Sequence, residues 1–533
     1  MPTERRAFLK MLSALGLSGL AGAARSAYPT LETPSAAADW CGSDHHPQPL
    51  FIPRDRGFLG RLRPDGEVVT LRAAPVRAGD DAAKAGFTLG YVARHRGRDY
   101  VNPTLVLQPA QRVRLELAST LDEPTIVHWH GLAVDARNDG SGMSLVARGG
   151  RYAYDFEVRN RSALYWYHPH PHGLTGGQAY RGLFGLIEIA DDDERALRSA
   201  LALVPGESEI PLILQDRRGA PYAAGESEQM HGFLGDTVLI NGTACPYLDV
   251  ATRIYRFRIL NASNARTYRL GLRSVEGKPV PFTLIGSDGG LLASGQRCDE
   301  AFIAAAERID VLVDMRDATL GDRLFLETRA FDPMHLEMAP NTAAAAAAHA
   351  EHAGHGSAFA EGAPRALLEL RVRERLVYDR KIPPRLSTMQ SVDVSKAEER
   401  PLRLGFAKGR WRINDKVFAM GETPIEVKRG TVETWLIRNY FNSMPHAMHL
   451  HGFRFQVLER QTSPDQVAAL KVDARGRLAT DLGWKDTALI WPGESVRIAI
   501  DFTLPFPGEQ TYVFHCHNME HEDGGMMLGV RVI

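Results

Sequence analysis

The C-terminal segment of the chain concentrates side chains that bind soft metal ions. Residues 515–527 combine a thiol, imidazoles and thioethers, and the preceding residues 511–514, Thr-Tyr-Val-Phe, predict a buried β-strand. Side chains two residues apart on a strand share one face. His515 and His517 are therefore expected to point one way and Cys516 the other, so that one strand serves two sites.

A mononuclear copper site is the first of these two sites. Cys516, His521 and Met526 provide a thiolate, an imidazole and a thioether, the ligand types of a blue copper centre, which needs a second imidazole. The motif at 446–451, His-Ala-Met-His-Leu-His, provides one. If this motif is extended, its first histidine, His446, lies on the face opposite to the last two, because it is an odd number of residues away from them.

Four pairs of histidines, each pair two residues apart, are left for the second site. Two pairs lie in the N-terminal part of the chain and two in the C-terminal part: His128 with His130, His168 with His170, His449 with His451, and His515 with His517. In an extended segment each pair shares a strand face. Eight imidazoles are enough for a cluster of three copper ions with open positions for O2, held where the first and last domains meet.

The elements that position these motifs are predicted to be β-strands. Apolar and charged residues alternate in 112–117, 255–259 and 496–502, which predicts half-buried strands of antiparallel β-sandwiches. The histidine pairs recur in the same order near both ends of the chain, so we interpret the N-terminal and C-terminal domains as copies of one module. In the first copy Pro169 stands where Cys516 stands in the last, which leaves one mononuclear site and not two.

Three domains are predicted from changes in composition along the chain, at 46–190, 205–375 and 395–533. The clearest strand segment of the middle domain, 239–270, contains no histidine, and we expect this domain to be a spacer that gives no copper ligand. An Ala/His-rich insertion at 339–362 is interpreted either as a surface segment that binds copper weakly or as plain filler.

The N-terminal residues 1–27 have the pattern of an export signal. Arg5 and Arg6 are followed by Ala-Phe-Leu-Lys and a mildly apolar run, which is typical of signals read by the twin-arginine export machinery and predicts a periplasmic or otherwise exported protein. No other stretch is long and apolar enough to span a bilayer. The formal net charge of −1 over 533 residues does not suggest a nucleic acid partner.

Taken together, the histidine and cysteine motifs resemble those of the multicopper oxidases, particularly the bacterial cuprous oxidases, spore-coat laccases and bilirubin oxidases. The resemblance covers nearly all of the chain after the export signal. It implies an all-β fold of three cupredoxin-like Greek-key β-sandwich domains. It also implies an oxidoreductase with four copper ions per chain, in which a mononuclear blue copper accepts single electrons from a small-molecule or metal-ion reductant and a trinuclear cluster reduces O2 to water.

The same resemblance implies how the cluster ligands are divided. His128 and His449 would hold the single cluster copper, and six further imidazoles would hold the coupled pair: His130, His168, His170, His451, His515 and His517. Cys516 and its two histidine neighbours would form the electron route between the two sites.

Two carboxylates are implied near the cluster, because reduction of O2 consumes protons. Asp139, nine residues after His130, matches the acidic residue that the family places near the cluster copper, and Glu522, directly after His521, matches a carboxylate of a proton relay. The alternative is that Glu522 is a solvated loop charge. We expect the substitution Asp139→Asn to slow reoxidation by O2 and to leave the blue absorption intact.

The electron donor is the least determined part of the prediction. At the positions that help bind copper(I) in the cuprous oxidases, this chain has Asn442 and Met444, so the thioether is present and the carboxylate is absent. We therefore expect a phenolic or other aromatic reductant that reaches an exposed edge of His521. A cuprous oxidase is the alternative, and a non-catalytic copper-binding protein is disfavoured because all twelve ligand candidates are retained.

Overall fold

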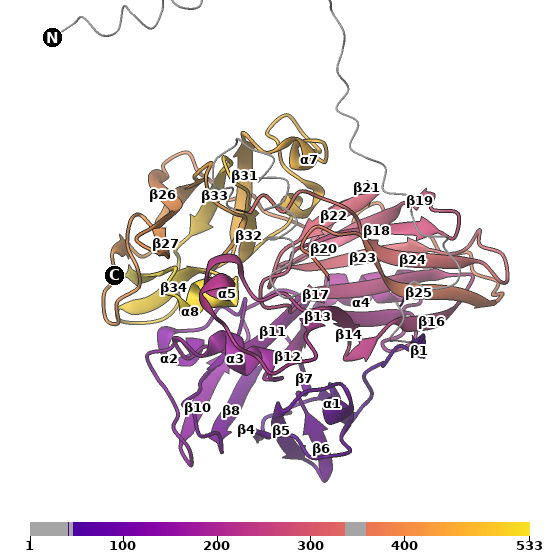
Figure 1. Ribbon diagram of the computed structural model, residues 1–533, viewed down its shortest axis with the longest axis horizontal. Coiled ribbons are helices and arrows are strands. Elements are labelled where there is room, and N and C mark those ends of the chain that lie inside the picture. Colours follow the sequence, from indigo (N-terminus) through magenta and orange to yellow (C-terminus); the bar gives the residue numbers. More distant parts are fainter. Residues whose placement is uncertain (1–40, 42–45, 336–358) are drawn as a thin grey trace, which may run out of the picture. The chain divides into compact units, whose positions relative to one another are not determined.

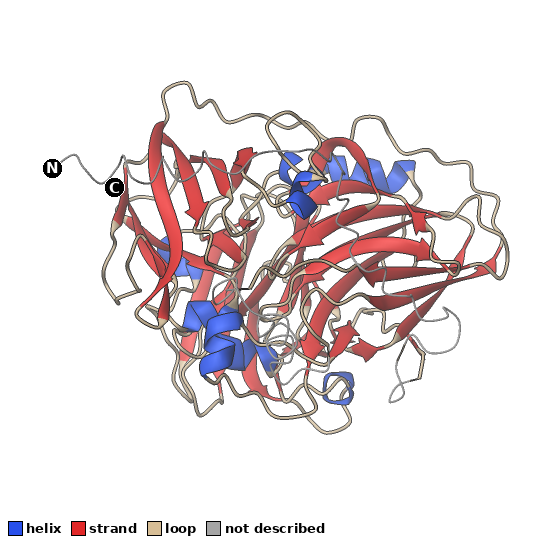
Figure 2. Cartoon of the chain, turned by 45° about the horizontal axis from the view of Figure 1, so that its top comes forward, coloured by secondary structure: helices blue, strands red, loops and turns tan. Residues whose placement is uncertain are grey.

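The computed structural model describes Cys41, residues 46–335 and residues 359–533. The predicted export signal and most of the Ala/His-rich insertion, with its histidines His349, His352 and His355, lie outside the described residues. The described part consists mainly of strands, with short helices between them (Figures 1 and 2). The strands form six sheets that pack in pairs around three apolar cores, which confirms the all-β prediction of three cupredoxin-like sandwiches.

The first sandwich spans residues 57–189 and carries two of the histidine pairs. Its strands are β2 (Gly57–Phe58), β3 (Arg61–Leu62), β4 (Val68–Pro75), β5 (Leu89–His95), β6 (Arg98–Val101), β7 (Thr104–Leu107), β8 (Arg112–Ser119), β9 (Val127–His128), β10 (Arg151–Glu157), β11 (Ala163–Pro169) and β12 (Gly185–Ile189). They form sheets of order β10-β8-β4-β5-β6-β2 and β3-β7-β12-β11-β9. The helices are α1 (Asp81–Lys84), α2 (Ala136–Asp139) and α3 (Thr175–Tyr180). The apolar residues Val113, Leu115 and Leu117 of β8 lie in the core, as the alternation predicts.

The second sandwich contains the strands between residues 209 and 374 and also β1 (Gln48–Pro49), which pairs with β16. The other strands are β13 (Glu209–Arg217), β14 (Thr237–Ile240), β15 (Thr243–Ala244), β16 (Pro246–Ala251), β17 (Ile254–Asn261), β18 (Tyr268–Ser274), β19 (Pro279–Val280), β20 (Phe282–Ser287), β21 (Gly290–Cys298), β22 (Glu300–Ile303), β23 (Arg308–Asp314), β24 (Arg323–Thr328) and β25 (Arg365–Glu374). Helix α4 (Asp192–Ala200) precedes these strands, and α5 (Glu226–His231) interrupts them. The two sheets have the orders β1-β16-β25-β24-β18-β19, with β22 paired to β18, and β15-β14-β13-β17-β23-β20-β21.

Strand β17 departs from the prediction of a half-buried strand. Its arginines Arg256 and Arg258 are as buried as the apolar residue between them, Phe257. Arg256 pairs with Glu194 of α4, with Glu209 of β13 at 3.1 Å, and with Asp310 of β23. The outer face of this sheet is therefore covered by α4, and the buried guanidinium groups persist there because each has carboxylate partners.

The third sandwich carries the other two histidine pairs. Its strands are β26 (Glu398–Ala407), β27 (Arg410–Ile413), β28 (Ile425–Val427), β29 (Val432–Asn439), β30 (His446–Leu450), β31 (Phe455–Gln461), β32 (Thr487–Ile490), β33 (Ser495–Asp501), β34 (Gln510–Cys516) and β35 (Met527–Val532). They form sheets of order β27-β26-β29-β33-β31 and β28-β35-β34-β30-β32. The short helices are α7 (Asp465–Ala468), the 3-10 helix η2 (Ala479–Leu482) and α8 (Met519–Asp523).

The structure also shows the state of two cysteines and the character of the helices. Cys245 and Cys298, whose pairing the sequence leaves open, are both free thiols. Within the described residues, no helix has the length and apolar character needed to cross a membrane.

Candidate metal centre

Equivalent strand pairs carry the histidine motifs in the first and third sandwiches. In the third, antiparallel β30 and β34 place His449 opposite His515 and Met448 opposite Cys516. In the first, β9 and β11 place His128 opposite His168. The repeated register supports the interpretation that the two sandwiches are copies of one module. It also explains how motifs far apart in the sequence come to lie side by side.

Cys516 lies at the centre of the mononuclear site. Its Sγ atom lies 3.5 Å from Nδ1 of His446 and 3.6 Å from Nδ1 of His521. Met526 is fully buried beside them, and its backbone carbonyl accepts a hydrogen bond from the Cys516 N–H at 3.0 Å. Ligand atoms around a tetrahedral metal ion lie about 3.5 Å apart when metal–nitrogen bonds are about 2.0 Å and metal–sulfur bonds about 2.3 Å. The spacing of these donor atoms therefore fits a metal ion.

Burial keeps the unliganded site in its protonated-thiol and neutral-imidazole form. It raises the pKa of the Cys516 thiol to about 12 and lowers the pKa of His446 to about 3. Copper binding must therefore displace a proton from sulfur, whereas the imidazoles are already in the neutral form that binds metals. This donor set of thiolate, imidazoles and thioether is the one that copper prefers in blue sites.

The expectation that His521 has an exposed edge is wrong. The side chain of Asn518 caps α8 by accepting hydrogen bonds from the N–H groups of Glu520 and His521, which places His521 beside the thiol. The Nε2 atom of His521 then donates to the carbonyl of Met230 at 3.0 Å, and the ring is only 1% exposed. Trp411 Nε1 donates to the same carbonyl at 2.8 Å. Helix α5 of the second sandwich, to which Met230 belongs, therefore covers the ring and leaves its Nδ1 atom facing sulfur.

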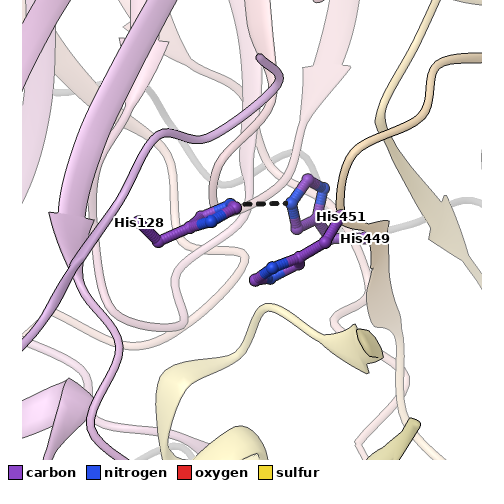
Figure 3. A group of neighbouring side chains, drawn as sticks. All are labelled: His128, His449 and His451. Carbon is purple, nitrogen blue, oxygen red and sulfur yellow. Dashed lines mark hydrogen bonds between the residues drawn. The ribbon is translucent and has the colours of Figure 1, made fainter. Parts of the chain in front are cut away.

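The eight paired histidines converge in one buried group between the first and third sandwiches. The Nε2 atoms of seven of them face one another across this group: His128 and His449 at 3.4 Å, His168 and His517 at 3.3 Å, His451 and His515 at 3.1 Å, and His170 and His515 at 3.4 Å. Tetrahedral nitrogen ligands with metal bonds of about 2.0 Å lie about 3.3 Å apart. Figure 3 shows His128 of the first sandwich facing His449 and His451 of the third. The geometry fits the predicted three-copper cluster.

For six of the eight histidines, hydrogen bonds fix which ring nitrogen faces the cluster. Five of them donate a hydrogen bond from Nδ1. The acceptors are the Asp139 carbonyl for His128 (2.8 Å), the Pro169 carbonyl for His168 (2.9 Å), the Asp486 carbonyl for His449 (2.8 Å), the Asp139 carboxylate for His451 (2.8 Å) and the Cys516 carbonyl for His515 (3.0 Å). The Nε2 lone pairs are therefore directed to the cluster. His130 is reversed, because its Nε2 donates to Asp486 and its buried Nδ1 has no hydrogen-bond partner among the described residues. Because the Nε2 of His130 donates to Asp486, its Nδ1 is the ring nitrogen with a lone pair available to a metal ion.

Asp139 contributes through both its backbone and its side chain. Its carbonyl orients His128, and its carboxylate Oδ2 accepts from His451 Nδ1. Helix α2 can end against β9 because Gly140 follows it in the left-handed region (φ 76°), and a Cβ there would lie 1.7 Å from the Val127 carbonyl oxygen. The structure therefore places Asp139 at the cluster, as expected, and makes it a positioning group for two imidazoles.

Replacing Asp139 with asparagine is expected to slow reoxidation of the reduced enzyme by about tenfold or more, within the range for groups that orient metal ligands. The blue absorption should remain, because Asp139 has no contact with the Cys516 site among the described residues. Stopped-flow mixing of reduced enzyme with O2 measures both the rate of reoxidation and the return of the blue absorption. Asp135→Asn is the matched control, because Asp135 caps the same helix and asparagine also caps well. Equal reoxidation rates in the two variants would rule out this role for Asp139.

A second positioning carboxylate, Asp486, has no metal-binding motif around it in the sequence. Its Oδ1 accepts from His130 Nε2 at 3.0 Å and from Arg308 at 2.7 Å. Arg308 belongs to β23, so the second sandwich holds the carboxylate that orients a cluster imidazole. The prediction that this domain is only a spacer is therefore too narrow, although none of the twelve ligand candidates comes from it. No spacing rule could have found this contact, because His130 and Asp486 are 356 residues apart.

Glu522 lies at the cluster and is not a solvated loop charge. It is 1% exposed, and its two carboxylate oxygens lie 3.4 Å from His170 Nε2 and 3.3 Å from His515 Nδ1. Burial raises the pKa of this carboxyl well above its usual range. Burial therefore favours the protonated form of this carboxyl group, which lies close enough to the cluster to supply a proton.

Comparison with known proteins places this arrangement in a family. The multicopper oxidase mco of Staphylococcus aureus is 30% identical to this chain over 452 residues, which is 84% of each protein. The chain belongs to the multicopper oxidase family. Two domain families described as multicopper oxidase match residues 96–194 and 381–533, the parts that carry the histidine motifs.

Other multicopper oxidases extend the similarity along the chain. A laccase of Bacillus subtilis is 31% identical over 445 residues, which is 76% of this chain and 78% of that protein. The crystal structure of McoA multicopper oxidase from the hyperthermophile Aquifex aeolicus superposes with a TM-score of 0.78 at 36% identity, covering 92% of this chain and 100% of that one. This multicopper oxidase is therefore an oxidoreductase that uses O2, and the donor atoms described above fit the copper that its family implies.

Proposed function

We propose that this multicopper oxidase is laccase-like and oxidises phenolic or other aromatic reductants one electron at a time. Four phenols and one O2 would give four phenoxyl radicals and two water molecules. The observation that carries the proposal is the division of residues 515–517 between two sites, with Cys516 in contact with His446 and His521 while its neighbours face the histidine cluster. Two sites joined by one strand suit an enzyme that collects single electrons and delivers them together.

The residues would divide the work as follows. Cys516, His446, His521 and Met526 would hold one copper ion, and the eight paired histidines would hold three. Bound copper supplies one-electron transfer and a place for O2. Cys516 connects the sites covalently through its peptide bonds to His515 and His517. Asp139 and Asp486 keep the imidazoles in the ligating tautomer, and Glu522 holds a proton beside the cluster.

A large cavity supports an aromatic donor although His521 itself is buried. The cavity has a volume of about 1010 Å³, and Trp411 and His521 both line it. The rings of these two residues lie 5.1 Å apart. Tyr180, Tyr222 and Phe418 also line it and provide surfaces on which an aromatic ring can pack. A donor in this cavity would lie next to a blue copper ligand.

Copper(I) is the second candidate donor, and a different cavity favours it. His231 and His335 have ring centroids 5.8 Å apart and line a small cavity together with Met444. Imidazole and thioether are ligand types that copper(I) accepts. The side chain of Asn442 is an amide, so it supplies no carboxylate in place of the one that the cuprous oxidases have.

The donor is tested by measuring O2 uptake of the copper-loaded protein with a methoxyphenol and with copper(I) in turn. We expect the phenol to give the higher kcat/KM. The variant Met444→Leu separates the two routes, since it should reduce only uptake that copper(I) supports. Uptake with copper(I) alone would replace the phenol proposal by the cuprous oxidase, and no uptake with either donor would contradict both.

We also propose that the protein is exported by the twin-arginine machinery to the periplasm or beyond. The proposal rests on the Arg5-Arg6 motif and the apolar run that follows it. Immunodetection in separated cell fractions tests it. We expect the mature protein outside the cytoplasm, and its accumulation in the cytoplasm alone would contradict the proposal.

A further inference from the structure

The donor cavity beside His521 is built by all three sandwiches and carries more positive than negative side chains. Four arginines line it: Arg181, Arg217, Arg218 and Arg410. Three carboxylates line it: Glu123, Glu520 and Asp523. What a ligand meets there depends on which of these charges are already paired within the protein.

Two of the four arginines have carboxylate partners. Arg181 pairs with Glu123 at 2.5 Å, and Arg218 pairs with Glu228 at 2.9 Å. Arg217 donates to backbone carbonyls and lies over the ring of Tyr180, but it forms no ion pair with a described residue. Arg410 is exposed and likewise forms no ion pair within the described part of the chain. Two cationic groups in the cavity, of which Arg410 is the more exposed, thus have no carboxylate partner among the described residues.

The two remaining carboxylates are already engaged by donors of the protein. Glu520 accepts from the Tyr222 hydroxyl, from the Asn264 amide and from the backbone N–H of Phe233. Asp523 accepts from the backbone N–H groups of Thr175 and Gly176 at 2.9 Å each. These contacts direct both carboxylates toward the protein, so they offset the free arginines less than their number suggests.

Arg410 stands on a rigid element next to the ring that contacts the blue copper ligands. Strands β26 and β27 pair Ala407 with Arg410 and are joined by Lys408 and Gly409, both in the left-handed region (φ 52° and 72°), which makes a tight hairpin. Trp411, the next residue, is buried with its ring centroid 4.6 Å from that of His446. The alternation of β27 thus turns Trp411 toward the copper site and Arg410 toward the cavity and solvent.

We propose that the donor cavity selects aromatic reductants that carry a carboxylate or sulfonate group, and that Arg410 is the residue that recognises this group. The inference rests on the proposed function, since it names the donor class for the same site. The aromatic ring would lie against Trp411 and the tyrosines, and the anionic group would lie against the guanidinium. Oxidation itself is unchanged: each phenol loses one electron and one proton.

A pair of donors that share one phenol ring and differ in the charge of one substituent tests the selection. Syringate (4-hydroxy-3,5-dimethoxybenzoate) and its methyl ester present the same phenol ring with and without a carboxylate. We expect the wild-type enzyme to have a KM for syringate about three- to tenfold below that for the ester, the range of one solvent-accessible charge-assisted contact. This difference should shrink as salt is added. The same KM for acid and ester in the wild-type enzyme would overturn the proposal.

Substitution of Arg410 separates recognition from structure. Arg410→Gln should raise the KM for syringate to that of the ester and leave kcat unchanged, and Arg410→Glu should make the ester the better donor. Arg412→Gln is the matched control: Arg412 lies two residues along the same strand, donates to the Ala407 and Asp415 carbonyls, and does not line the cavity. An equal rise in KM for both donors in Arg410→Gln would indicate a structural role and would also overturn the proposal.

Calorimetric binding of 4-methoxybenzoate, which has no phenol to oxidise, gives a readout that does not depend on turnover. The copper-loaded wild type and Arg412→Gln should bind it about three- to tenfold more tightly than Arg410→Gln does. If neither syringate nor its ester supports O2 uptake, the proposed laccase-like function fails, and this titration still decides whether the cavity recognises anionic aromatics. Equal binding by the wild type and Arg410→Gln would contradict the inference.

Discussion

Replacing Cys516 with serine is expected to abolish the blue absorption and to lower oxidation of every donor by about 10³-fold or more, the scale of losing a group on which all turnover depends. Serine fits the space of this fully buried residue, so the fold should persist. Its hydroxyl is a hard and weakly acidic group, which cannot replace a thiolate as a copper ligand. The backbone connection to His515 and His517 would remain, but the thiolate that binds the mononuclear copper would be absent.

Absorption spectra, copper analysis and O2 uptake measure this variant. We expect about one copper ion fewer per chain, with the histidine cluster still loaded, because the cluster ligands lie on the other face of the strand. Cys298→Ser is the control, since Cys298 is a free thiol of the second sandwich. A Cys516→Ser protein that keeps its blue band would mean that the mononuclear site lies elsewhere.

Replacing Glu522 with glutamine is expected to slow the oxygen-reducing half of the cycle by about 10²- to 10⁴-fold, the range of a general acid's contribution. The amide has the same shape and position as the carboxyl group that lies between His170 and His515, but it has no acidic proton to supply. The blue band and its reduction by the donor should be unchanged. Stopped-flow reoxidation of the reduced enzyme measures the effect.

The variant Glu522→Asp distinguishes proton supply from packing. It retains the acid with a shorter side chain and should recover part of the rate. If Glu522→Gln is reoxidised as fast as the wild type, protons reach the cluster by another route. If Glu522→Asp is as slow as Glu522→Gln, the acid supplies its proton only from the distance that the longer glutamate side chain reaches.

Much of the site could be predicted because strand geometry converts spacing into direction. The alternation of His515, Cys516 and His517 and the odd offset of His446 from the later histidines of its motif hold in the structure. The paired motifs also predicted that the first and last domains are copies of one module, and the strand registers of the two sandwiches are equivalent. These inferences needed local geometry alone, since each motif lies on a single strand or strand end.

The missed features all depend on contacts between distant segments. Arg256 is charged in an alternating pattern, yet it is buried because α4 supplies a carboxylate to it. His521 looks like an accessible ligand, yet Met230 from another sandwich covers it. Asp486 has no metal-binding motif around it, but Arg308 and His130 meet there from two other domains. Tertiary packing determines the burial and the contacts of such residues, and the spacing of residues in the sequence carries no information about this packing.

The central claim is that four electrons enter one at a time beside Cys516 and leave together at the histidine cluster. The most direct test is the ratio of donor oxidised to O2 consumed by protein loaded with copper, with hydrogen peroxide assayed in the same sample. We predict four copper ions per chain, four donor molecules oxidised for each O2, and no peroxide. Two donor molecules oxidised for each O2, with peroxide as the product, would contradict the claim.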